Sequence, residues 1–426
     1  MLGLKHGTVM LCMHEKEWET EAQNTILRLK QILGNALKDI QHVGSTSVPS
    51  IKAKPIIDIA ASTDDFGKVL SAVEELEKEG FYYRPNACLS GQLLFACGSY
   101  YSGTGDLQTH FIHIVKAESM EWINYINFRN YLIKKPSAAK EYENLKISLA
   151  EANPIDNGRE KYHKGKHDFI VYTLRKALVD SYLGKTVKIE IDRPIGYMHK
   201  KKNYTLNYPI NYGFIPGIIG GDGEELDVYL IGVDIPVKEY TGRIIGIVHR
   251  EDDSEDKLVM APENTYFSQN EIAEKIDFQE CYYHTYIESI CQKSCGAVIY
   301  RRCKNQIEYL CLLQKKSQTY SVPKGHMEAF ESEKQTAERE ILEEIGIHAA
   351  FERNFKTVVQ YSISDIKHKR VVLFLAECRD TLKIKDGEIS KYEWLPLQEA
   401  KKTLPVWYMP VLDKAEETLN KNSTEQ

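Results

Sequence analysis

A motif near the carboxyl end constrains the fold of this chain more than any other feature of the sequence. It consists of a glycine, a glutamate and a charged run at fixed spacing, namely Gly325, Glu331 and Arg339–Ile347. Between them, Ser332 and Gln335 have the spacing of a capping box, which starts a helix, and Gly346 can take the left-handed conformation that ends one. The sequence therefore predicts a helix of about fourteen residues between Ser332 and Gly346.

Three carboxylates fall on one face of this predicted helix. At ~100° per residue, Glu340, Glu343 and Glu344 lie within an arc of roughly 100°, beside an apolar strip. Like charges so close together destabilise a helix, and a hard divalent cation with oxygen ligands supplies the missing counter-charge. We therefore expect Mg²⁺, or alternatively Mn²⁺, which would bind diphosphate oxygens and help to activate an attacking water. The alternative is a solvated charged face without a ligand.

The motif resembles the Nudix box, Gly-x5-Glu-x7-Arg-Glu-U-x-Glu-Glu-x-Gly-U with U aliphatic, and the resemblance covers residues 293–419. It implies an α/β/α sandwich around a mixed sheet and hydrolysis of a phosphoanhydride. It also implies the site residues: metal ligands Glu340, Glu343 and Glu344, an orienting Arg339, and Glu331 as a further ligand or base. A downstream glutamate commonly completes such a site, and Glu388 is our choice for it, with Glu393 as the rival.

The loop before the motif indicates a substrate. Its sequence, Ser-Val-Pro-Lys-Gly-His-Met-Glu from Ser321, resembles the Pro-Lys-Gly-His sequence of the diadenosine tetraphosphate hydrolase branch. This resemblance implies a dinucleoside polyphosphate substrate, with Lys324 and His326 on phosphate oxygens and Tyr361 stacked on a base. The alternatives are a broader nucleoside or sugar diphosphate hydrolase, a Lys324 that is an ordinary surface lysine, and a Tyr361 at the edge of the core.

The middle of the chain has a different pattern. Short alternating apolar segments interrupted by glycine and proline predict a small β-barrel or sandwich over residues 181–291. Its Asn211-Tyr212-Gly213, followed by Asp222-Gly-Glu-Glu-Leu-Asp227, resembles the soluble inorganic pyrophosphatase family. The resemblance implies a barrel with a polyacidic metal site that includes Asp222 and Asp227, and a Tyr212 that faces phosphate. Acidic residues of this kind also form ordinary hairpin turns, which is the alternative.

The middle segment also departs from that family. Glu224 stands where the family has the shorter aspartate, and the late Tyr-Lys pair is missing. A second acidic group resembles the later metal ligands of the family: Asp252, Asp253, Glu255 and Asp256, before Lys257. The expected phosphate-binding arginine is not evident, and we expect Lys200 or a neighbour in its place, although lysine lacks the planar fork of arginine.

The first 180 residues alternate amphipathic helices with short strands, which predicts an α/β domain with a helix over Glu15–Leu33 and a buried strand over Pro55–Ala61. Residues 41–49 and 52–59 resemble the GrpB family, which has the nucleotidyltransferase fold. The resemblance implies a nucleotide or phosphate site in which the amides of Gly44 and Ser45 approach phosphate and Asp58 holds a metal. Ala60 replaces the second carboxylate that transfer chemistry needs, so binding is expected more than transfer. Four further side chains are candidate contacts: His110, His113, Lys161 and Lys166.

Together these patterns predict a multidomain α/β and α+β protein with domains at 1–180, 181–291 and 292–426. With 55 Lys and Arg against 61 Asp and Glu, the chain has no overall positive field for long nucleic acid. Its nine cysteines lack paired metal-site spacing, and no apolar run approaches the ~20 residues of a membrane span. We therefore expect a reduced, cytoplasmic compartment and small-molecule partners, with no membrane.

The leading hypothesis is a Mg²⁺-dependent Nudix hydrolase of a nucleoside polyphosphate. One alternative is a nucleotidyltransferase whose released pyrophosphate is removed by the barrel. The other is that the first two domains are nucleotide-binding modules without catalysis. The substrate, the oligomeric state and the coupling between domains stay open.

Overall fold

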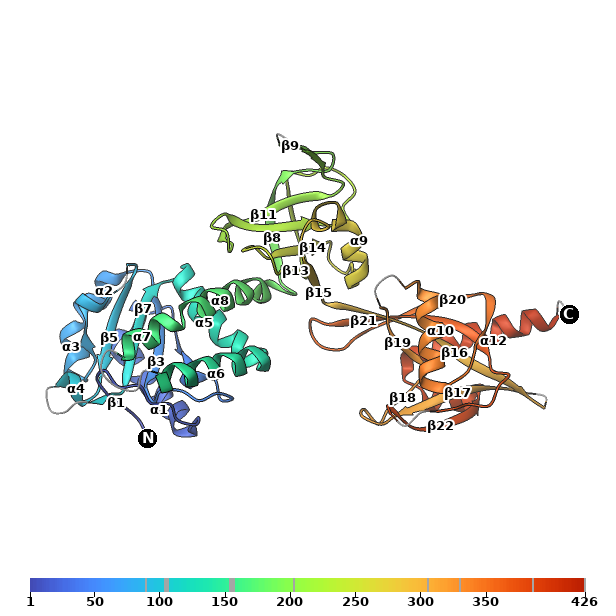
Figure 1. The fold of residues 1–426 in the computed structure, drawn as a ribbon, viewed down its shortest axis with the longest axis horizontal. Coiled ribbons are helices and arrows are strands. Elements are labelled where there is room, and N and C mark those ends of the chain that lie inside the picture. The colour runs from blue at the N-terminus through green and yellow to red at the C-terminus, as the bar shows by residue number, and fades with distance from the viewer. Residues whose placement is uncertain are drawn as a thin grey trace. The chain divides into compact units, whose positions relative to one another are not determined.

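The computed structural model of the chain describes residues 1–88, 90–102, 107–152, 158–201, 204–304, 306–328, 331–384 and 387–424 (Figure 1). They form two compact units, one of Met1–Tyr182 with Ile218–Glu224 and one of Leu183–Gly217 with Glu225–Gln426. Among the helices of these described ranges, none is both long and apolar enough to cross a membrane.

The first unit is built around a five-stranded mixed sheet of order β2-β3-β7-β5-β4, in which β3 and β7 run parallel. Its strands are β2 (Asp39–Val43), β3 (Ile57–Thr63), β4 (Tyr82–Tyr83), β5 (Gln92–Cys97) and β7 (His110–Lys116), with a separate pair β1 (Leu4–Lys5) and β6 (Leu107–Gln108). Its helices are α1 (Lys16–Leu33), α2 (Phe66–Ser71), α3 (Val73–Lys78), α4 (Ser99–Ser102), α5 (Met120–Lys134), α6 (Pro136–Ala152), α7 (Gly158–Gly165) and α8 (His167–Tyr182). The expected α/β character is confirmed.

Two local predictions for this unit are also confirmed. α1 ends at Gly34, whose φ of 45° is one that glycine adopts without strain. Strand β3 is buried and lies between β2 and β7, where Ile57 and Ile59 are fully covered. Apolar residues of α1, Ile26 among them, pack on this strand and form the core of the unit.

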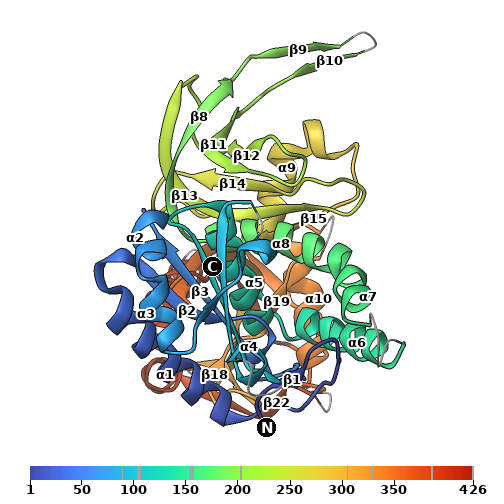
Figure 2. The ribbon, with the colours of Figure 1, turned by 90° about the vertical axis from the view of Figure 1, so that its left-hand side faces the viewer.

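The middle of the chain is a closed barrel of five strands, in the order β14-β12-β11-β8-β13, with β13 pairing back onto β14. The strands are β8 (Thr186–Arg193), β11 (Asn211–Ile219), β12 (Glu225–Leu230), β13 (Glu239–Arg250) and β14 (Lys257–Ala261), and β15 (Thr285–Ser289) adds to β13. A hairpin of β9 (Met198–Lys201) and β10 (Tyr204–Asn207) extends beyond the barrel strands (Figure 2), and helix α9 spans Gln269–Glu280. The expected small β-barrel is therefore confirmed.

The last part is a seven-stranded sheet with helices on both faces. Its strands are β16 (Cys291–Cys303), β17 (Gln306–Gln314), β18 (Tyr320–Ser321), β19 (Lys324–His326), β20 (Ala350–Ser362), β21 (His368–Glu377) and β22 (Ile389–Pro396). Its helices are α10 (Glu333–Ile345), α11 (Leu397–Thr403) and α12 (Met409–Thr424). Successive residues of β16 point to opposite faces, so Ile299 packs with Ile341 of α10, and Val298 packs with Leu412 of α12. This arrangement is the expected α/β/α sandwich.

Ile290 alone separates strands β15 and β16. It is fully buried, and both of its backbone groups are bonded. Its N–H donates to the carbonyl of Ile245 in β13 at 2.9 Å, and its carbonyl accepts from the N–H of His368 in β21 at 2.8 Å.

Candidate active site

The charged motif forms helix α10, and both predicted ends are confirmed. Ser332 and Gln335 make a reciprocal capping box, in which the Gln335 N–H donates to the Ser332 hydroxyl at 3.3 Å and the Ser332 N–H donates to the Gln335 side chain at 2.9 Å. Gly346 ends the helix with φ 68° and ψ 27°. Ala337, Ile341 and Ile345 are fully buried, as the apolar strip predicted. Glu340 and Glu344, both only partly exposed, lie beside this strip, whereas Glu343 is exposed to solvent.

Arg339 gathers three of the acidic side chains of the motif. Its Nε and Nη2 donate to the two carboxylate oxygens of Glu331 at 2.7 and 3.0 Å, and Nη1 donates to Glu340 at 2.8 Å and Glu343 at 3.2 Å. Nη2 also donates to the carbonyl of His326 at 2.8 Å, which ties the preceding loop to the helix. The paired hydrogen bonds from Arg339 lower the pKa of Glu331 to about 2.

Gly325 is the motif glycine because the backbone passes directly over a carboxylate there. It lies in β19, which pairs with β16. A Cβ atom at position 325 would overlap the carboxylate of Glu340. The glycine therefore allows Glu340 to lie against the β19 backbone, and any larger residue has to displace it.

Glu344 lies in a second, more enclosed environment of the same helix. Its Oε2 atom is buried and has no hydrogen-bond partner among the residues that the structure describes. Burial raises the pKa of Glu344 to about 8, opposed by the charge of Lys324 and reinforced by Glu340 and Glu388. Burial also lowers the pKa of Lys324, opposed by the same three carboxylates. Lys324, Glu340, Glu344 and Glu388 thus share one electrostatic environment.

A cavity of about 810 Å³ adjoins this group. Lys324, Glu388 and Tyr361 all line it, together with Trp407, whose ring stacks on Tyr361 with centroids 4.7 Å apart and planes 18° apart. Trp407 was missed at the level of the sequence, because it lies far from the motif and nothing in its local pattern marks it. Glu393, the rival for the downstream glutamate, is instead bound by Lys391 and by the hydroxyl of Tyr320 at 3.1 Å.

The carboxylates of α10 offer only oxygen ligands for a metal ion. Within the described ranges, no three His, Cys, Asp or Glu side chains lie close enough together to form a ready-made metal site. Glu340 and Glu343 share their oxygens with Arg339, and His326 is exposed. By chemistry the set still fits a hard divalent cation, because Glu344 has a buried oxygen without a donor and two further carboxylates, Glu340 and Glu388, act on it.

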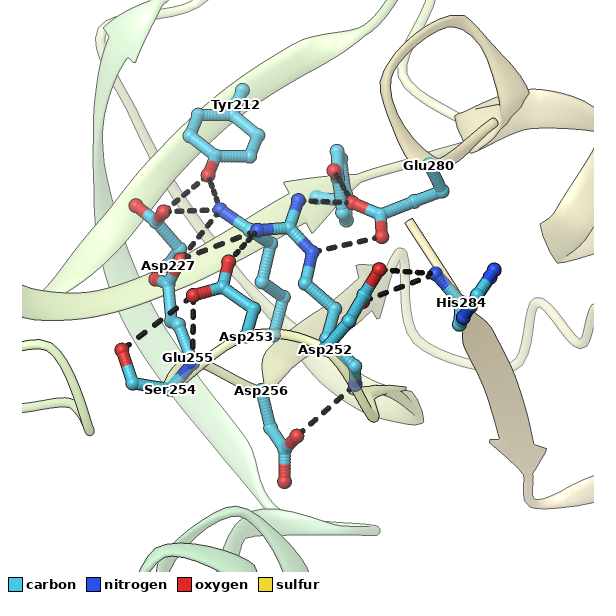
Figure 3. Close-up of polar contacts among 12 residues, drawn as sticks. Tyr212, Asp227, Asp252, Asp253, Ser254, Glu255, Asp256, Glu280 and His284 are labelled. Carbon is cyan, nitrogen blue, oxygen red and sulfur yellow. Dashed lines mark hydrogen bonds and ion pairs between the residues drawn. The ribbon is translucent and has the colours of Figure 1, made fainter. Parts of the chain in front are cut away.

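The barrel holds a second acidic group, and the cations of the chain itself lie among its carboxylates (Figure 3). The Lys257 ammonium contacts Asp227, the hydroxyl of Tyr212 and, at 3.0 Å, Glu255. The buried Arg250 donates to Glu280 at 2.6 and 3.0 Å and to Asp253 at 2.9 Å, and its guanidinium lies 3.6 Å from the centre of the Tyr283 ring. As they stand, these carboxylates do not fit a cluster of metal ions, because lysine and arginine side chains take up their oxygens.

The other residues expected in the barrel lie apart from this group. Asp222 is exposed in the turn between β11 and β12, where its carboxylate accepts the N–H of Glu224 at 3.0 Å. Lys200 is exposed on β9. Arg193 lies nearer, with its guanidinium 4.9 Å from the Tyr212 ring centre and a hydrogen bond of 2.7 Å to Tyr208.

In the first unit, Gly44, Ser45 and Asp58 line one cavity of about 140 Å³. Gly44 has φ 70°, and a Cβ there would overlap the Asp58 carboxylate, so the Gly-Ser turn and the β3 carboxylate are adjacent, as expected. His113 lies 3.7 Å from Asp58, and Lys166 lines the cavity. His110, by contrast, contacts the hydroxyls of Thr25 and Thr109, and Lys161 is exposed.

Comparisons with known proteins match three successive parts of the chain. Family models match it at residues 8–176 (GrpB protein), 177–291 (inorganic pyrophosphatase) and 292–415 (NUDIX domain). The glutamate-rich protein GrpB of Alkalihalophilus pseudofirmus is 35% identical over 171 residues, which is 40% of this chain and 96% of that protein. The asymmetrical bis(5'-nucleosyl)-tetraphosphatase of Sus scrofa is 35% identical over 120 residues, 25% of this chain and 81% of that protein.

The match in the middle is shorter. The inorganic pyrophosphatase of Rickettsia prowazekii is 32% identical over 82 residues, 18% of this chain, and the chain spans 48% of its length. Among solved structures, GrpB from Enterococcus faecalis is 32% identical, with 41% of this chain and 99% of that chain covered and a TM-score of 0.37. The Ap4A hydrolase binary complex of C. elegans is 28% identical, with 30% and 98% covered and a TM-score of 0.29. The first part of the chain therefore belongs to the GrpB family, and the middle part is a pyrophosphatase-like domain. The last part belongs to the Nudix hydrolases, which act on phosphoanhydride bonds.

Proposed function

We propose that the Nudix domain of this chain hydrolyses a phosphoanhydride bond of a dinucleoside polyphosphate such as diadenosine tetraphosphate. The stacked pair of Tyr361 and Trp407, in the same cavity as Lys324 and Glu388, carries the proposal. A nucleobase that stacks on such a surface gains ~1–3 kcal/mol, and Trp407 keeps 39% of its surface exposed for it. The volume of about 810 Å³ suits a nucleotide. The similarity to the pig tetraphosphatase supports the same class of substrate.

We further propose that Mg²⁺, with Mn²⁺ as a substitute, is the metal of this site and that Glu340, Glu343 and Glu344 hold it. When bound, the ion would neutralise diphosphate charge and lower the pKa of a coordinated water. Lys324 lines the same cavity as the aromatic pair and shares the electrostatic environment of the carboxylates, so its ammonium can bind a phosphate oxygen of the substrate. Glu388, which lines the same cavity, remains our choice for the additional acidic ligand.

Arg339 and Glu331 have a positioning role in this proposal. Arg339 holds Glu331 through two hydrogen bonds, and Glu331 in turn accepts the N–H of Glu328 at 3.1 Å. A carboxylate with a pKa of about 2 is a weak base near neutral pH. Glu331 is therefore better suited to fixing Arg339 and the loop that contains His326 than to accepting a proton from water.

The experiment is a comparison of two glutamates of α10. With Mg²⁺ present, Glu344→Gln should lower kcat for diadenosine tetraphosphate by at least about 100-fold, because it removes a carboxylate from the site. Glu338→Gln is the matched control, since Glu338 is exposed and pairs only weakly with Lys334 at 4.0 Å. Trp407→Ala should raise KM for diadenosine tetraphosphate with little change in kcat. Full turnover in Glu344→Gln would contradict the proposal.

For the first two domains we propose binding without turnover. Ala60 is buried in β3, so Asp58 is the carboxylate that this strand brings to the small cavity. In the barrel, Arg250 and Lys257 bind the carboxylates that a metal would need. We therefore expect no hydrolysis of pyrophosphate by the barrel in the presence of Mg²⁺. Pyrophosphate turnover that is lost in Asp227→Asn would show the opposite.

A further inference from the structure

The small cavity of the first unit has a lining that points to a particular kind of ligand. Its volume is about 140 Å³, and its walls come from the Gly-Ser turn, β3 and the helical region around α7. The charged or ionisable side chains that line it are Asp58, Lys54, His163 and Lys166, together with Tyr142 and Tyr162. Nothing in the activity of the Nudix domain involves this cavity.

The size of the cavity limits what it can hold. Sites for drug-sized ligands measure ~300–1,000 Å³, whereas one water takes up about 30 Å³ of liquid. At about 140 Å³ the cavity lies between these values. It is too small for a nucleoside together with its phosphates, and it has room for a compact ion of a few heavy atoms.

The charges in the wall favour an anion over a cation. Lys54 and Lys166 flank the ring of Tyr162, with their ammonium nitrogens 5.1 and 4.6 Å from its centre. The Lys54 ammonium is also 3.5 Å from Nε2 of His163. Lys166 is only 8% exposed, so its charge acts in a poorly solvated environment, where electrostatic attraction is strong. A metal ion bound to Asp58 would be repelled by the ammonium groups of these two lysines.

Asp58 selects among anions. Its side chain lines the cavity and keeps 32% of its surface accessible. A carboxylate repels a fully deprotonated anion, but it accepts a hydrogen bond from an anion that carries a proton. At neutral pH, phosphate carries at least one proton, whereas sulfate, of the same shape and charge, carries none.

We propose that this cavity binds inorganic phosphate, with Lys54 and Lys166 neutralising its charge and Asp58 accepting its proton. The wall is preorganised for this purpose. Gly44 lets the turn lie against Asp58, and Tyr142 stacks on Phe169 with centroids 5.1 Å apart. The site therefore needs little rearrangement to receive the ion.

The test is calorimetry on the full chain with EDTA present, in which inorganic phosphate and sulfate are titrated at equal ionic strength. Phosphate should bind at least about tenfold more tightly than sulfate, because the Asp58 carboxylate is left without a donor and repels an anion that carries no proton. The nearly isosteric Asp58→Asn should reduce this difference to under about threefold, since an amide can donate to either anion.

Two lysine controls locate the site. Lys54→Met should weaken phosphate binding at least about tenfold. Lys164→Met should change the affinity for phosphate by less than about twofold, because it removes only a surface charge that pairs with Glu160 in the same helical region. Lys324→Met, in the Nudix cavity, should also leave it unchanged. Equal affinity for phosphate and sulfate, absence of phosphate binding, or loss of binding in Lys324→Met would each overturn the proposal. These outcomes are independent of diadenosine tetraphosphate turnover.

Discussion

Replacing Arg250 by methionine tests whether the acidic centre of the barrel depends on the cations of the chain. Arg250 is 2% exposed, and it is bonded to Glu280, which is 5% exposed. In the variant, Glu280 retains the hydroxyl of Tyr229 as a donor but loses its counter-charge. Breaking a buried pair by removing one partner costs about 3–5 kcal/mol. Because Asp253 is partly solvated, we assign this cost to Glu280.

Hydrogen exchange is the assay for this variant, because intrinsic fluorescence does not report on the barrel. All four tryptophans lie outside it, namely Trp18, Trp122, Trp394 and Trp407. A loss of 3–5 kcal/mol corresponds to roughly 150- to 5,000-fold faster exchange in the strands β12 and β13. The double variant Arg250→Met/Glu280→Leu removes both charges and should return to within about 2 kcal/mol of the parent. A rise below tenfold in the single variant, or faster exchange in the double than in the single variant, would refute the reasoning.

Three further predictions concern the Nudix domain. Gly325→Ala should lower kcat/KM by about 100-fold while far-UV circular dichroism stays unchanged, because the new Cβ displaces the Glu340 carboxylate; wild-type activity would contradict this. Burial raises the pKa of Glu344 from 4.5 to about 8, so its contribution to stability is complete below pH 4.5 and is lost as the pH rises towards 8. Without metal, Glu344→Gln should therefore melt at a higher temperature than the parent at pH 9 and at the same temperature at pH 4, and a less stable variant at pH 9 would show the sign to be wrong. Finally, EDTA should abolish turnover and added Mn²⁺ should restore it, whereas activity that survives exhaustive chelation would exclude the proposed metal.

The parts of the structure that the sequence predicts are those whose determinants lie close together along the chain. Helix α10 could be placed at both ends because Ser332, Gln335 and Gly346 act within one or two turns of their own positions. Arg339 was expected to orient one carboxylate, but the structure places it on three, and on the carbonyl of His326 thirteen residues earlier. That reach depends on how the loop folds over the helix.

The parts that could not be predicted depend on contacts between distant segments. Arg250 and Glu280 are thirty residues apart, and their pairing follows from the position of α9 against β13. The acidic residues before Lys257 suggested a metal site. The sequence shows these carboxylates side by side, but it does not show which lysine or arginine side chain of the chain binds them in the fold. Trp407 likewise acquires its place beside Tyr361 only through the packing of the last helices.

The single residue between β15 and β16 affects how this protein can be divided. Because the N–H of Ile290 serves one domain and its carbonyl serves the next, a protease has no exposed linker to cleave there, and gene truncation at this point leaves one domain with an unsatisfied backbone group. If the barrel were removed by evolution or by engineering, a change near the first strand of the Nudix sheet would therefore have to replace the lost backbone hydrogen bond. The contributions of the barrel and the Nudix domain are therefore better separated with point substitutions than with shortened chains.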